Sequence, residues 1–364
     1  MANWYSTDWW HRVPVIVKAS QAGGATHADY PCLLASSLPA HLWGRVRSDG
    51  LDCVLTAADG VTPLYREVAT FDVAGERPEV YFRLPSYSHL EDTLVYLYYR
   101  NPDYSEPSDV AVWPTDTWAA VYHMNDDPAD STKILDSTAN ANHGTKGAGT
   151  AAPTEVAGAV GRAQQFVQAD IDVINLPVTL RGMGGADRTI TALTTFGSAT
   201  LVGTVETLWY SGSGGTGAGR PGINWCRSAA ANIRARFSDG SATYITNNLS
   251  QSPFGTHVLT LVIDIGATML QYCDGTPGVA TDISAQPADV DDQLGPIAGG
   301  TGGADTSLSG LFDELRLSSV ARSGEWIAAE GHWLRNNSLC YEVGAYEHRP
   351  LYIMQGYRRT TDGA

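Results

Sequence analysis

Basic residues are scarce in this chain, and lysine is almost missing from it. The only lysines are Lys18, Lys133 and Lys146, and 23 Lys and Arg residues stand against 39 Asp and Glu, for a formal net charge of −16. Non-specific binding to nucleic acid and docking on anionic lipid both need clustered positive charge. We therefore expect neither a nucleic acid nor a membrane surface among the partners of this protein.

Long apolar runs and paired cysteines are missing as well. No apolar stretch is long enough to span a bilayer, and residues 1–10 have neither the basic stretch nor the apolar run of a secretory signal. The cysteines are odd in number, scattered and without CxxC spacing, so we expect no disulfide framework and no zinc site. We expect most of them to be small buried apolar residues. The five are Cys32, Cys53, Cys226, Cys273 and Cys340.

Common catalytic motifs do not occur in the sequence, which has no GxSxG, no HExxH and no GxxxxGKS/T. Asp313 and Glu314 are neighbours, so on a strand their side chains point to opposite faces and cannot act as a facing pair. We therefore predict that the chain is not an enzyme. A glycanase stays open as an alternative, because two carboxylates far apart in sequence can still meet across a cleft.

What the chain has in abundance is the residue types of strands and turns. It has 364 residues, of which 43% are hydrophobic, and it contains 38 glycines, 17 tyrosines and 10 tryptophans. Short runs of β-branched and aromatic residues alternate with turn signals, which indicates an all-β protein built of sandwiches. The candidate strands are 12–17, 52–56, 79–84, 93–99, 119–124, 190–193, 201–205, 232–237, 243–245, 257–265 and 269–273.

One segment near the C-terminus has helical rather than strand periodicity. Its apolar residues Trp326, Ile327, Trp333 and Leu334 fall on one face of a helix. Ser323 precedes them and can cap the first turn. We predict one short helix here.

The organisation along the chain indicates two domains and a trailing segment. We predict an N-terminal β-sandwich over 1–112, a second domain over 113–347 and a C-terminal arm over 348–364. Tyr, Met and Arg are favoured at interfaces, so we expect the arm to contact a neighbouring subunit; an unordered tail is the alternative. The arm residues in question are Tyr352, Met354, Tyr357 and Arg358.

The N-terminal section resembles a β-sandwich domain of uncharacterised function that often precedes laminin-G-like domains in bacterial, archaeal and viral surface proteins. One departure is Arg100, where the family pattern usually has glycine. If that position takes a positive φ, arginine is strained there. The matching stretches are 9–15, 49–56, 59–60, 84–86 and 96–102.

The second section resembles the laminin-G-like, concanavalin A-like lectin superfamily, which implies a jelly roll. The family usually has a glycine and an aspartate pair after Phe166, whereas this chain has 167–172 without that pattern, so a ligand from that loop is not expected. The matching stretches are 121–125, 136–145, 160–166, 311–317 and 341–345.

Jelly rolls of this type often bind one structural Ca²⁺ between a loop and a strand. Asp136 and Asn140 lie in an Asn-rich loop and Asp313 lies near a strand end, so these residues are the candidate ligands. The alternative is that Asp136 makes an Asx turn and Asp313 holds a loop by hydrogen bonds.

Aromatic residues next to a long glycine-rich loop are candidates for sugar binding. Trp209, Tyr210 and Trp225 flank the loop 211–222, and sugars stack on aromatic faces. The alternative is that these rings fill the core of a sandwich, as most Trp and Tyr side chains do.

These features together favour attachment or assembly rather than chemistry. Surface-type modules without an export signal suit a virus, whose structural proteins are made and assembled in the host cytoplasm. We therefore predict a tailed-virus virion component, either a tail fibre or spike adhesin or a capsid decoration protein. Its expected partners are other virion proteins, further copies of itself and host surface polysaccharide. The alternatives are a carbohydrate-binding module of a cellular surface protein and, after it, a glycanase.

Overall fold

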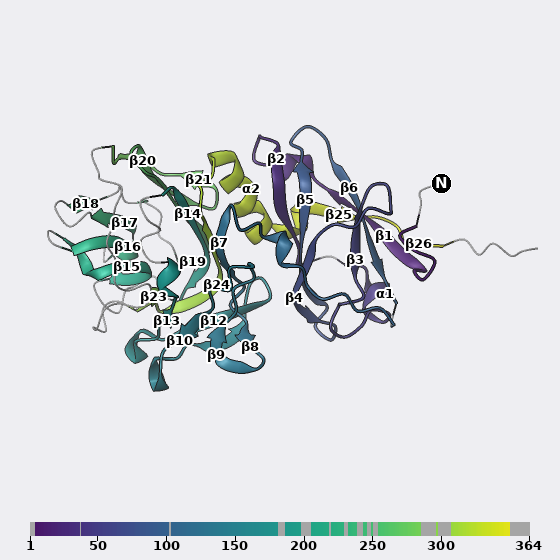
Figure 1. Ribbon diagram of the computed structural model, residues 1–364, viewed down its shortest axis with the longest axis horizontal. Coiled ribbons are helices and arrows are strands. Elements are labelled where there is room, and N and C mark those ends of the chain that lie inside the picture. Colours follow the sequence, from purple (N-terminus) through teal and green to yellow (C-terminus); the bar gives the residue numbers. More distant parts are fainter. Residues whose placement is uncertain are drawn as a thin grey trace, which may run out of the picture.

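The protein is all-β, as the sequence predicts. The computed structural model describes residues 4–36, 38–101, 103–180, 186–197, 205–217, 220–228, 232–238, 243–245, 249, 254–284, 296–297 and 307–349. Within these ranges, antiparallel strands form four sheets, which pack in pairs as two sandwiches. Figure 1 shows the N-terminal sandwich on the right, the second sandwich on the left and helix α2 between them.

The first sandwich packs a five-stranded sheet against a three-stranded one, counted over the described residues. Apolar side chains alternate along β1, so Val13, Val15 and Val17 are buried in the core shared by the two sheets. The strands of the larger sheet are β1 (His11–Val17), β3 (Val54–Ala57), β6 (Thr93–Tyr99), β25 (Tyr341–Val343) and β26 (Glu347–His348). Those of the smaller sheet are β2 (His27–Leu34), β4 (Arg66–Asp72) and β5 (Arg77–Tyr87).

The end of the described chain returns to this first sandwich. Strand β25 pairs with β1, with Val343 opposite Val15, and β26 continues the same edge, with His348 opposite His11. The segment 341–347, which the sequence groups with the second domain, therefore completes a sheet of the first one.

The second sandwich consists of two larger sheets, each nine-stranded over the described residues. Their facing sides bury one continuous apolar core. One sheet contains β7 (Trp118–Tyr122), β11 (Thr154–Ala157), β12 (Arg162–Phe166), β14 (Arg188–Phe196), β19 (Gly255–Asp264), β20 (Thr268–Cys273), β21 (Thr276–Pro277), β22 (Thr281–Asp282) and β24 (Gly310–Ser318). The other contains β8 (Asp126–Asp127), β9 (Asp130–Ile134), β10 (Gly144–Lys146), β13 (Ile174–Asn175), β15 (Val205–Gly217), β16 (Arg220–Ser228), β17 (Ile233–Ser238), β18 (Thr243–Ile245) and β23 (Pro296–Ile297).

Helix α2 (Gly324–Arg335) is the helix that the periodicity predicts, and it packs against both sandwiches (Figure 1). On the first sandwich, the ring of Trp326 lies 4.6 Å from that of Tyr30, centroid to centroid. On the second, Ile327 is buried against Val262 and Tyr272. The other two α-helices in the described ranges have four residues each, α1 (Ala40–Trp43) and α3 (Asn337–Cys340). None of these helices combines the length and the apolar character needed to cross a membrane.

Arg100 shows how one departure from the family pattern is accommodated. Its φ is +67°, a left-handed conformation that favours glycine. The backbone N–H groups of Arg100 and Asn101 donate to Asp52 Oδ2 at 3.0 and 3.3 Å. The Asp52 carboxylate therefore stabilises the turn despite the strained arginine.

The N-terminal cap of helix α2 contributes to the stability of the fold. The Ser323 hydroxyl accepts a hydrogen bond from the backbone N–H of Trp326 at 3.3 Å. Ser323→Ala should lower the free energy of unfolding by about 1 kcal/mol, because one N–H group loses its partner. Ser323→Asp keeps a capping oxygen and should stay near the wild-type value. Urea denaturation measures both, and equal stabilities for Ser323→Ala and wild type would contradict the assignment.

Candidate functional site

Charged side chains gather at the junction between the two sandwiches. We call this group the buried charge cluster. It draws side chains from strands β4, β5 and β24, from the end of β7 and from helix α2. All of its members are buried: Glu67, Glu79, His123, Glu314, Arg316 and Glu330.

His123 is the centre of the buried charge cluster. Its Nδ1 lies 2.6 Å from Glu314 Oε1, and its Nε2 lies 3.3 Å from Glu67 Oε2. The carboxylate of Glu79 approaches Nδ1 to 3.7 Å. The ring of Tyr81 stacks on the imidazole with the centroids 4.4 Å apart, and the Tyr81 hydroxyl donates to Glu314 at 2.8 Å. Both ring nitrogens of His123 are thus occupied by carboxylates.

Arg316 supplies the second cation of the cluster. Its guanidinium contacts Glu314 at 3.0 Å and Glu330 at 3.1 Å, so it links strand β24 to helix α2. The same guanidinium lies 5.1 Å from the ring centroid of Trp113 and 5.4 Å from that of Tyr81. Aromatic faces attract cations, so these rings stabilise the charge while excluding water.

Burial and mutual attraction set the protonation of the cluster. Burial raises the pKa of Glu79 to about 8, against the opposing effect of His123. Burial alone lowers the pKa of His123, but Glu314 and Glu67 outweigh it and hold that pKa well above its usual value. Burial likewise raises the pKa of Glu314, while His123 and Arg316 bring it below its usual value. Near neutral pH, Glu79 is therefore protonated, His123 is cationic and Glu314 is ionised.

The cluster joins the two sandwiches in one arrangement. Glu67 and Glu79 belong to the first sandwich, whereas His123 and Glu314 belong to the second. The contacts of Glu67 with His123 and of Tyr81 with Glu314 cross between the sandwiches, so both would be lost if the sandwiches separated. The backbone also comes close here, because a Cβ at Gly161, where φ is +52°, would lie 1.9 Å from Glu79 Oε2.

A pocket of about 430 Å³ lies beside the cluster, and we call it the junction pocket. This volume is in the range of small-molecule binding sites, which run from about 300 to 1,000 Å³. Glu67 and His123 belong to both the cluster and the pocket wall. The lining residues are Glu67, Val68, Ala69, Thr70, Ser108, His123, Asn125, Asp126, Pro128, Leu135, Ser137, Glu155 and Arg162.

The second sandwich contributes a connected set of charges to this pocket. Glu155 Oε2 accepts a hydrogen bond from the Asp126 backbone N–H at 2.6 Å, and its Oε1 lies 3.6 Å from Arg162 Nε. Lys146 Nζ lies 2.5 Å from Asp126 Oδ1. These contacts hold Asp126 and Glu155 in place on one wall of the pocket.

Asn125 adds an acceptor that has no partner among the described residues. Its Nδ2 donates to the Ala69 carbonyl at 3.0 Å, which fixes the amide, while its buried Oδ1 makes no hydrogen bond. A buried polar atom without a partner is unfavourable unless a ligand or water satisfies it. The lining has hydroxyls, carboxylates, one guanidinium and apolar patches, but no Trp, Tyr or Phe ring among the described residues. This arrangement suits a small, hydroxyl-rich group bound by hydrogen bonds.

The aromatic residues that the sequence proposes for sugar stacking lie elsewhere and are buried. Trp209 and Tyr210 are 2% exposed and Trp225 is 0% exposed. Trp209 and Trp225 pair across β15 and β16, and Trp225 Nε1 donates to Gln271 at 3.0 Å. A ring inside the core offers no face to a sugar, so the stacking-platform prediction is wrong and the alternative, core packing, describes these three residues.

The proposed calcium ligands serve as hydrogen-bond acceptors and donors. Asn140 Nδ2 donates to the Trp118 carbonyl at 3.0 Å. Asp313 accepts hydrogen bonds from the backbone N–H groups of Ala159 and Val160. Burial raises the pKa of Asp313 well above its usual value. No contact joins Asp136 to Asp313 among the described residues, and calcium at these positions stays a prediction. Asp136 accepts hydrogen bonds from the N–H groups of Val121, Thr138 and Asn142 and from the Thr138 hydroxyl.

The residues proposed for the C-terminal arm lie outside the described residues. They are Tyr352, Met354, Tyr357 and Arg358, and their expected contact with a neighbouring subunit stays a prediction. The described chain ends at Arg349, whose guanidinium lies 4.2 Å from the ring centroid of Trp10.

Sequence reasoning did not find the buried charge cluster or the junction pocket. Asp313 and Glu314 do separate as expected, since Glu314 turns to His123 while Asp313 turns to a hairpin loop. The pairing of β24 with β14 skips Asp313, which is the extra residue of a β-bulge. One signal in the sequence could have indicated the cluster. Glu314 and Arg316 are two residues apart on a largely apolar strand, so their charged side chains lie on the same face of that strand.

The pH dependence of stability tests the state of Glu79. Its folded-state pKa of about 8 lies above the ordinary value of 4.5, so folding favours the protonated form and stability is lost as the pH rises between these values. Glu79→Gln has no proton to lose. Its stability should therefore fall less steeply than that of wild type from about pH 5 to 8, by up to about 1.4 kcal/mol per pH unit.

Urea denaturation at several pH values measures this difference. Glu91→Gln, at an exposed glutamate, is the matched control and should follow wild type. Parallel stability curves for Glu79→Gln and wild type would show that Glu79 does not hold its proton in the fold.

No protein-family model matches this chain, and neither does any curated protein sequence. Solved structures resemble parts of it. The crystal structure of the botulinum neurotoxin serotype D binding domain aligns with a TM-score of 0.46 and 13% identity, covering 62% of this chain and 52% of that chain. The ligand binding domain of the same serotype in complex with N-acetylneuraminic acid aligns with a TM-score of 0.46 and 11% identity, covering 62% and 52%.

A Trypanosoma rangeli sialidase in complex with 2,3-difluoro-KDN aligns with a TM-score of 0.45 and 14% identity, covering 68% of this chain and 42% of that chain. The aligned part thus spans about half the length of each of these proteins. Likenesses this distant assign no family to the chain.

Proposed function

We propose that this chain is a non-catalytic attachment protein whose junction pocket binds a sugar unit of a surface glycan. The observation that carries the proposal is the pocket itself, which lies between two sandwiches and is lined by fixed hydrogen-bonding groups. Sugar hydroxyls can donate to Glu67, Glu155 and Asn125 Oδ1 and accept from Arg162. Apolar patches such as Pro128 and Leu135 suit the C–H faces of a sugar ring.

The charges of the pocket favour a neutral sugar over an anionic one. Its lining has the carboxylates of Glu67, Asp126 and Glu155, and each is already paired with a cation, namely His123, Lys146 and Arg162. Because these cations are already engaged by the protein's own carboxylates, an anionic group would have to compete with those carboxylates, which also repel it. Neutral hexoses or amino sugars therefore fit the pocket better than acidic ones.

The arrangement of the pocket also supports binding without catalysis. Glu67 Oε2 is held by the Trp113 indole at 2.6 Å and by His123 at 3.3 Å, and Glu155 is held by a backbone N–H and by Arg162. Carboxylates that already accept hydrogen bonds from the protein serve to position the neighbouring groups. A glycosidase instead needs one carboxylic acid and one carboxylate free to face the scissile bond.

We place this attachment protein in the virion of a tailed virus, as a tail fibre or spike adhesin or as a capsid decoration protein. The resemblance of the N-terminal section to a domain of bacterial, archaeal and viral surface proteins supports this placement. The alternative is a carbohydrate-binding module of a cellular surface protein, which would use the same pocket in the same way.

Glycan-array binding by the full chain tests the sugar proposal. Wild type should bind neutral glycans, and Glu155→Gln should weaken binding about tenfold, because one charge-assisted hydrogen bond is lost. Glu91→Gln, outside the pocket, should bind like wild type. Absence of binding to any glycan, or equal binding by Glu155→Gln, would contradict the proposal. Release of reducing ends by wild type, lost in Glu155→Gln, would establish the glycanase alternative instead.

Mass spectrometry of purified particles tests the virion placement. Particles of the virus that encodes this chain should contain it in stoichiometric amounts after extensive washing. Particles without the polypeptide would overturn the placement and leave the cellular surface module.

A further inference from the structure

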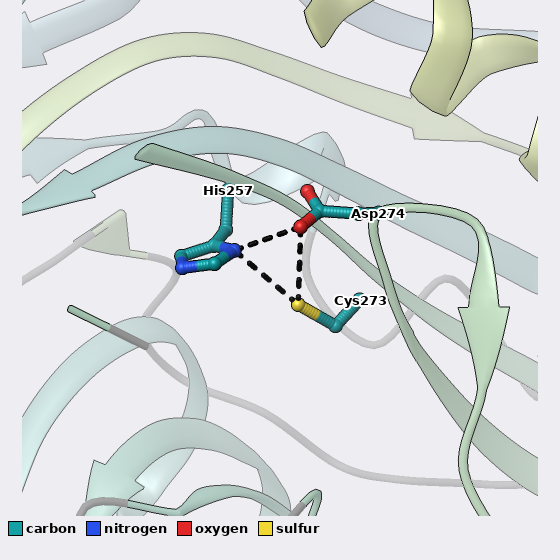
Figure 2. Close-up of side chains that lie close together, drawn as sticks. All are labelled: His257, Cys273 and Asp274. Atoms are coloured by element: carbon teal, nitrogen blue, oxygen red, sulfur yellow. Dashed lines mark hydrogen bonds and ion pairs between the residues drawn. The ribbon is translucent and has the colours of Figure 1, made fainter. Parts of the chain in front are cut away.

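Three side chains with different donor atoms converge at one end of the β19–β20 pair. The Nδ1 atom of His257 lies 2.9 Å from Asp274 Oδ2 and 3.5 Å from Cys273 Sγ, and that sulfur lies 3.8 Å from the same Asp274 oxygen. Figure 2 shows these contacts as a closed triangle, with the three side chains pointing toward one another. These residues are far from the junction pocket in sequence and none of them lines it.

The local backbone explains why these atoms meet. Cys273 is the last residue of β20 and pairs with Leu259, two residues after His257, so His257 and Cys273 lie on the same face of the sheet. Asp274 and Gly275 have φ values of +52° and +79°, as in the tight turns of β-hairpins. This turn bends the chain so that the Asp274 side chain returns toward His257.

The distances match those expected around a tetrahedral zinc ion. Zinc binds sulfur at about 2.3 Å and nitrogen or oxygen at about 2.0 Å, which places the sulfur about 3.5 Å from each of the other ligands and nitrogen about 3.3 Å from oxygen. The observed separations of 3.5, 3.8 and 2.9 Å each fall within about 0.4 Å of these values.

Two further contacts orient the ligands as in metal sites. The other ring nitrogen of His257, Nε2, lies 3.3 Å from the Phe254 carbonyl, so an Nε2–H tautomer leaves Nδ1 free to bind a cation. The second carboxylate oxygen of Asp274, Oδ1, accepts a hydrogen bond from the Val258 N–H at 3.0 Å. Metal-binding histidines and carboxylates are commonly fixed by such outer contacts.

The same geometry excludes a catalytic relay. In a Cys–His–Asp triad the thiol and the carboxylate contact different ring nitrogens, whereas here both approach Nδ1 of His257. Burial also raises the pKa of Cys273, which disfavours a free reactive thiolate. The convergence of Sγ, Nδ1 and Oδ2 on one point is instead the arrangement expected of three ligands around one ion.

Arg335, the last residue of α2, competes for this position. Its guanidinium forms an ion pair with Asp274 and lies 3.3 Å from His257 Nδ1. The Arg335 side chain is 38% exposed, so it can turn into solvent when another cation binds. Its present contact shows that the site attracts positive charge.

We propose that His257 Nδ1, Cys273 Sγ and Asp274 Oδ2 bind a zinc ion, with Arg335 displaced and the fourth position taken by water. Zinc suits this mixed set of nitrogen, sulfur and oxygen ligands better than calcium or magnesium, which prefer oxygen alone. The thiol loses its proton on binding, so zinc affinity rises with pH.

Cobalt(II) substitution tests the site in the full chain. The protein is freed of metal with a chelator and titrated with Co²⁺, and the thiolate-to-cobalt charge-transfer absorption is recorded before displacement by Zn²⁺. Wild type should bind one ion with this absorption, and Arg335→Gln should bind it more tightly because a competing cation is removed. Cys273→Ala should lose the absorption, whereas Cys340→Ala, at another buried cysteine, should keep it.

A second pair of variants covers the case in which Cys273→Ala does not fold. His257→Gln and Asp274→Asn should each weaken Co²⁺ binding at least about tenfold while retaining the thiol. The proposal is overturned if neither wild type nor Arg335→Gln shows the thiolate absorption. It is also overturned if the absorption survives in Cys273→Ala, or if both His257→Gln and Asp274→Asn bind Co²⁺ with unchanged absorption.

Discussion

The contact between His123 and Glu314 is the interaction on which the arrangement of this protein depends. Both groups are fully enclosed, and an isolated buried charge of either sign would be strongly unfavourable. Each is stable only because the other is present, with Arg316 on one side and the Tyr81 ring on the other. His123 and Glu314 both belong to the second sandwich, and Tyr81 and Glu67 of the first sandwich cover them and add a hydrogen bond to each, so the enclosure of this ion pair depends on the two sandwiches staying together.

The junction pocket follows from this constraint. Glu67 lines the pocket and contacts His123, so the same carboxylate that completes the buried charge cluster also forms part of the pocket wall. Helix α2 reinforces the junction through Glu330 and Trp326, and strands β25 and β26 bring the chain back to β1. A pocket lined by two domains keeps its shape only if the domains are held in register, and these contacts hold them.

Much of the fold could be predicted from residue patterns, because alternation and helical periodicity are local. The valines of β1 and the apolar face of α2 both lie where their spacing indicates, and the five cysteines are buried as expected. The sites could not be predicted in the same way. Glu67, His123 and Glu314 are far apart in sequence and meet only through tertiary packing.

The same reason explains the error at the aromatic residues and why the spacing of the cysteines gives no sign of the zinc site proposed above. Trp209 and Trp225 are of a residue type that binds sugars by stacking, so the sequence alone allows a sugar platform. The folded structure pairs them across β15 and β16 and buries their rings. Cys273 has no neighbouring cysteine, yet strand pairing brings His257 beside it and a turn brings Asp274. Residue spacing along one segment carries no information about ligands from adjacent strands.

The coupling between the two sandwiches can be measured most directly with a double-mutant cycle on Tyr81 and Glu314. Tyr81→Phe removes the hydroxyl that donates to Glu314 at 2.8 Å, and Glu314→Gln removes the charge that accepts it. Urea denaturation of the two single variants and the double variant gives their interaction energy. A coupling of about 1.5–3 kcal/mol is expected for a buried hydrogen bond to a charged group. Effects that add within about 0.3 kcal/mol would contradict the account, because the cluster would then not join the sandwiches.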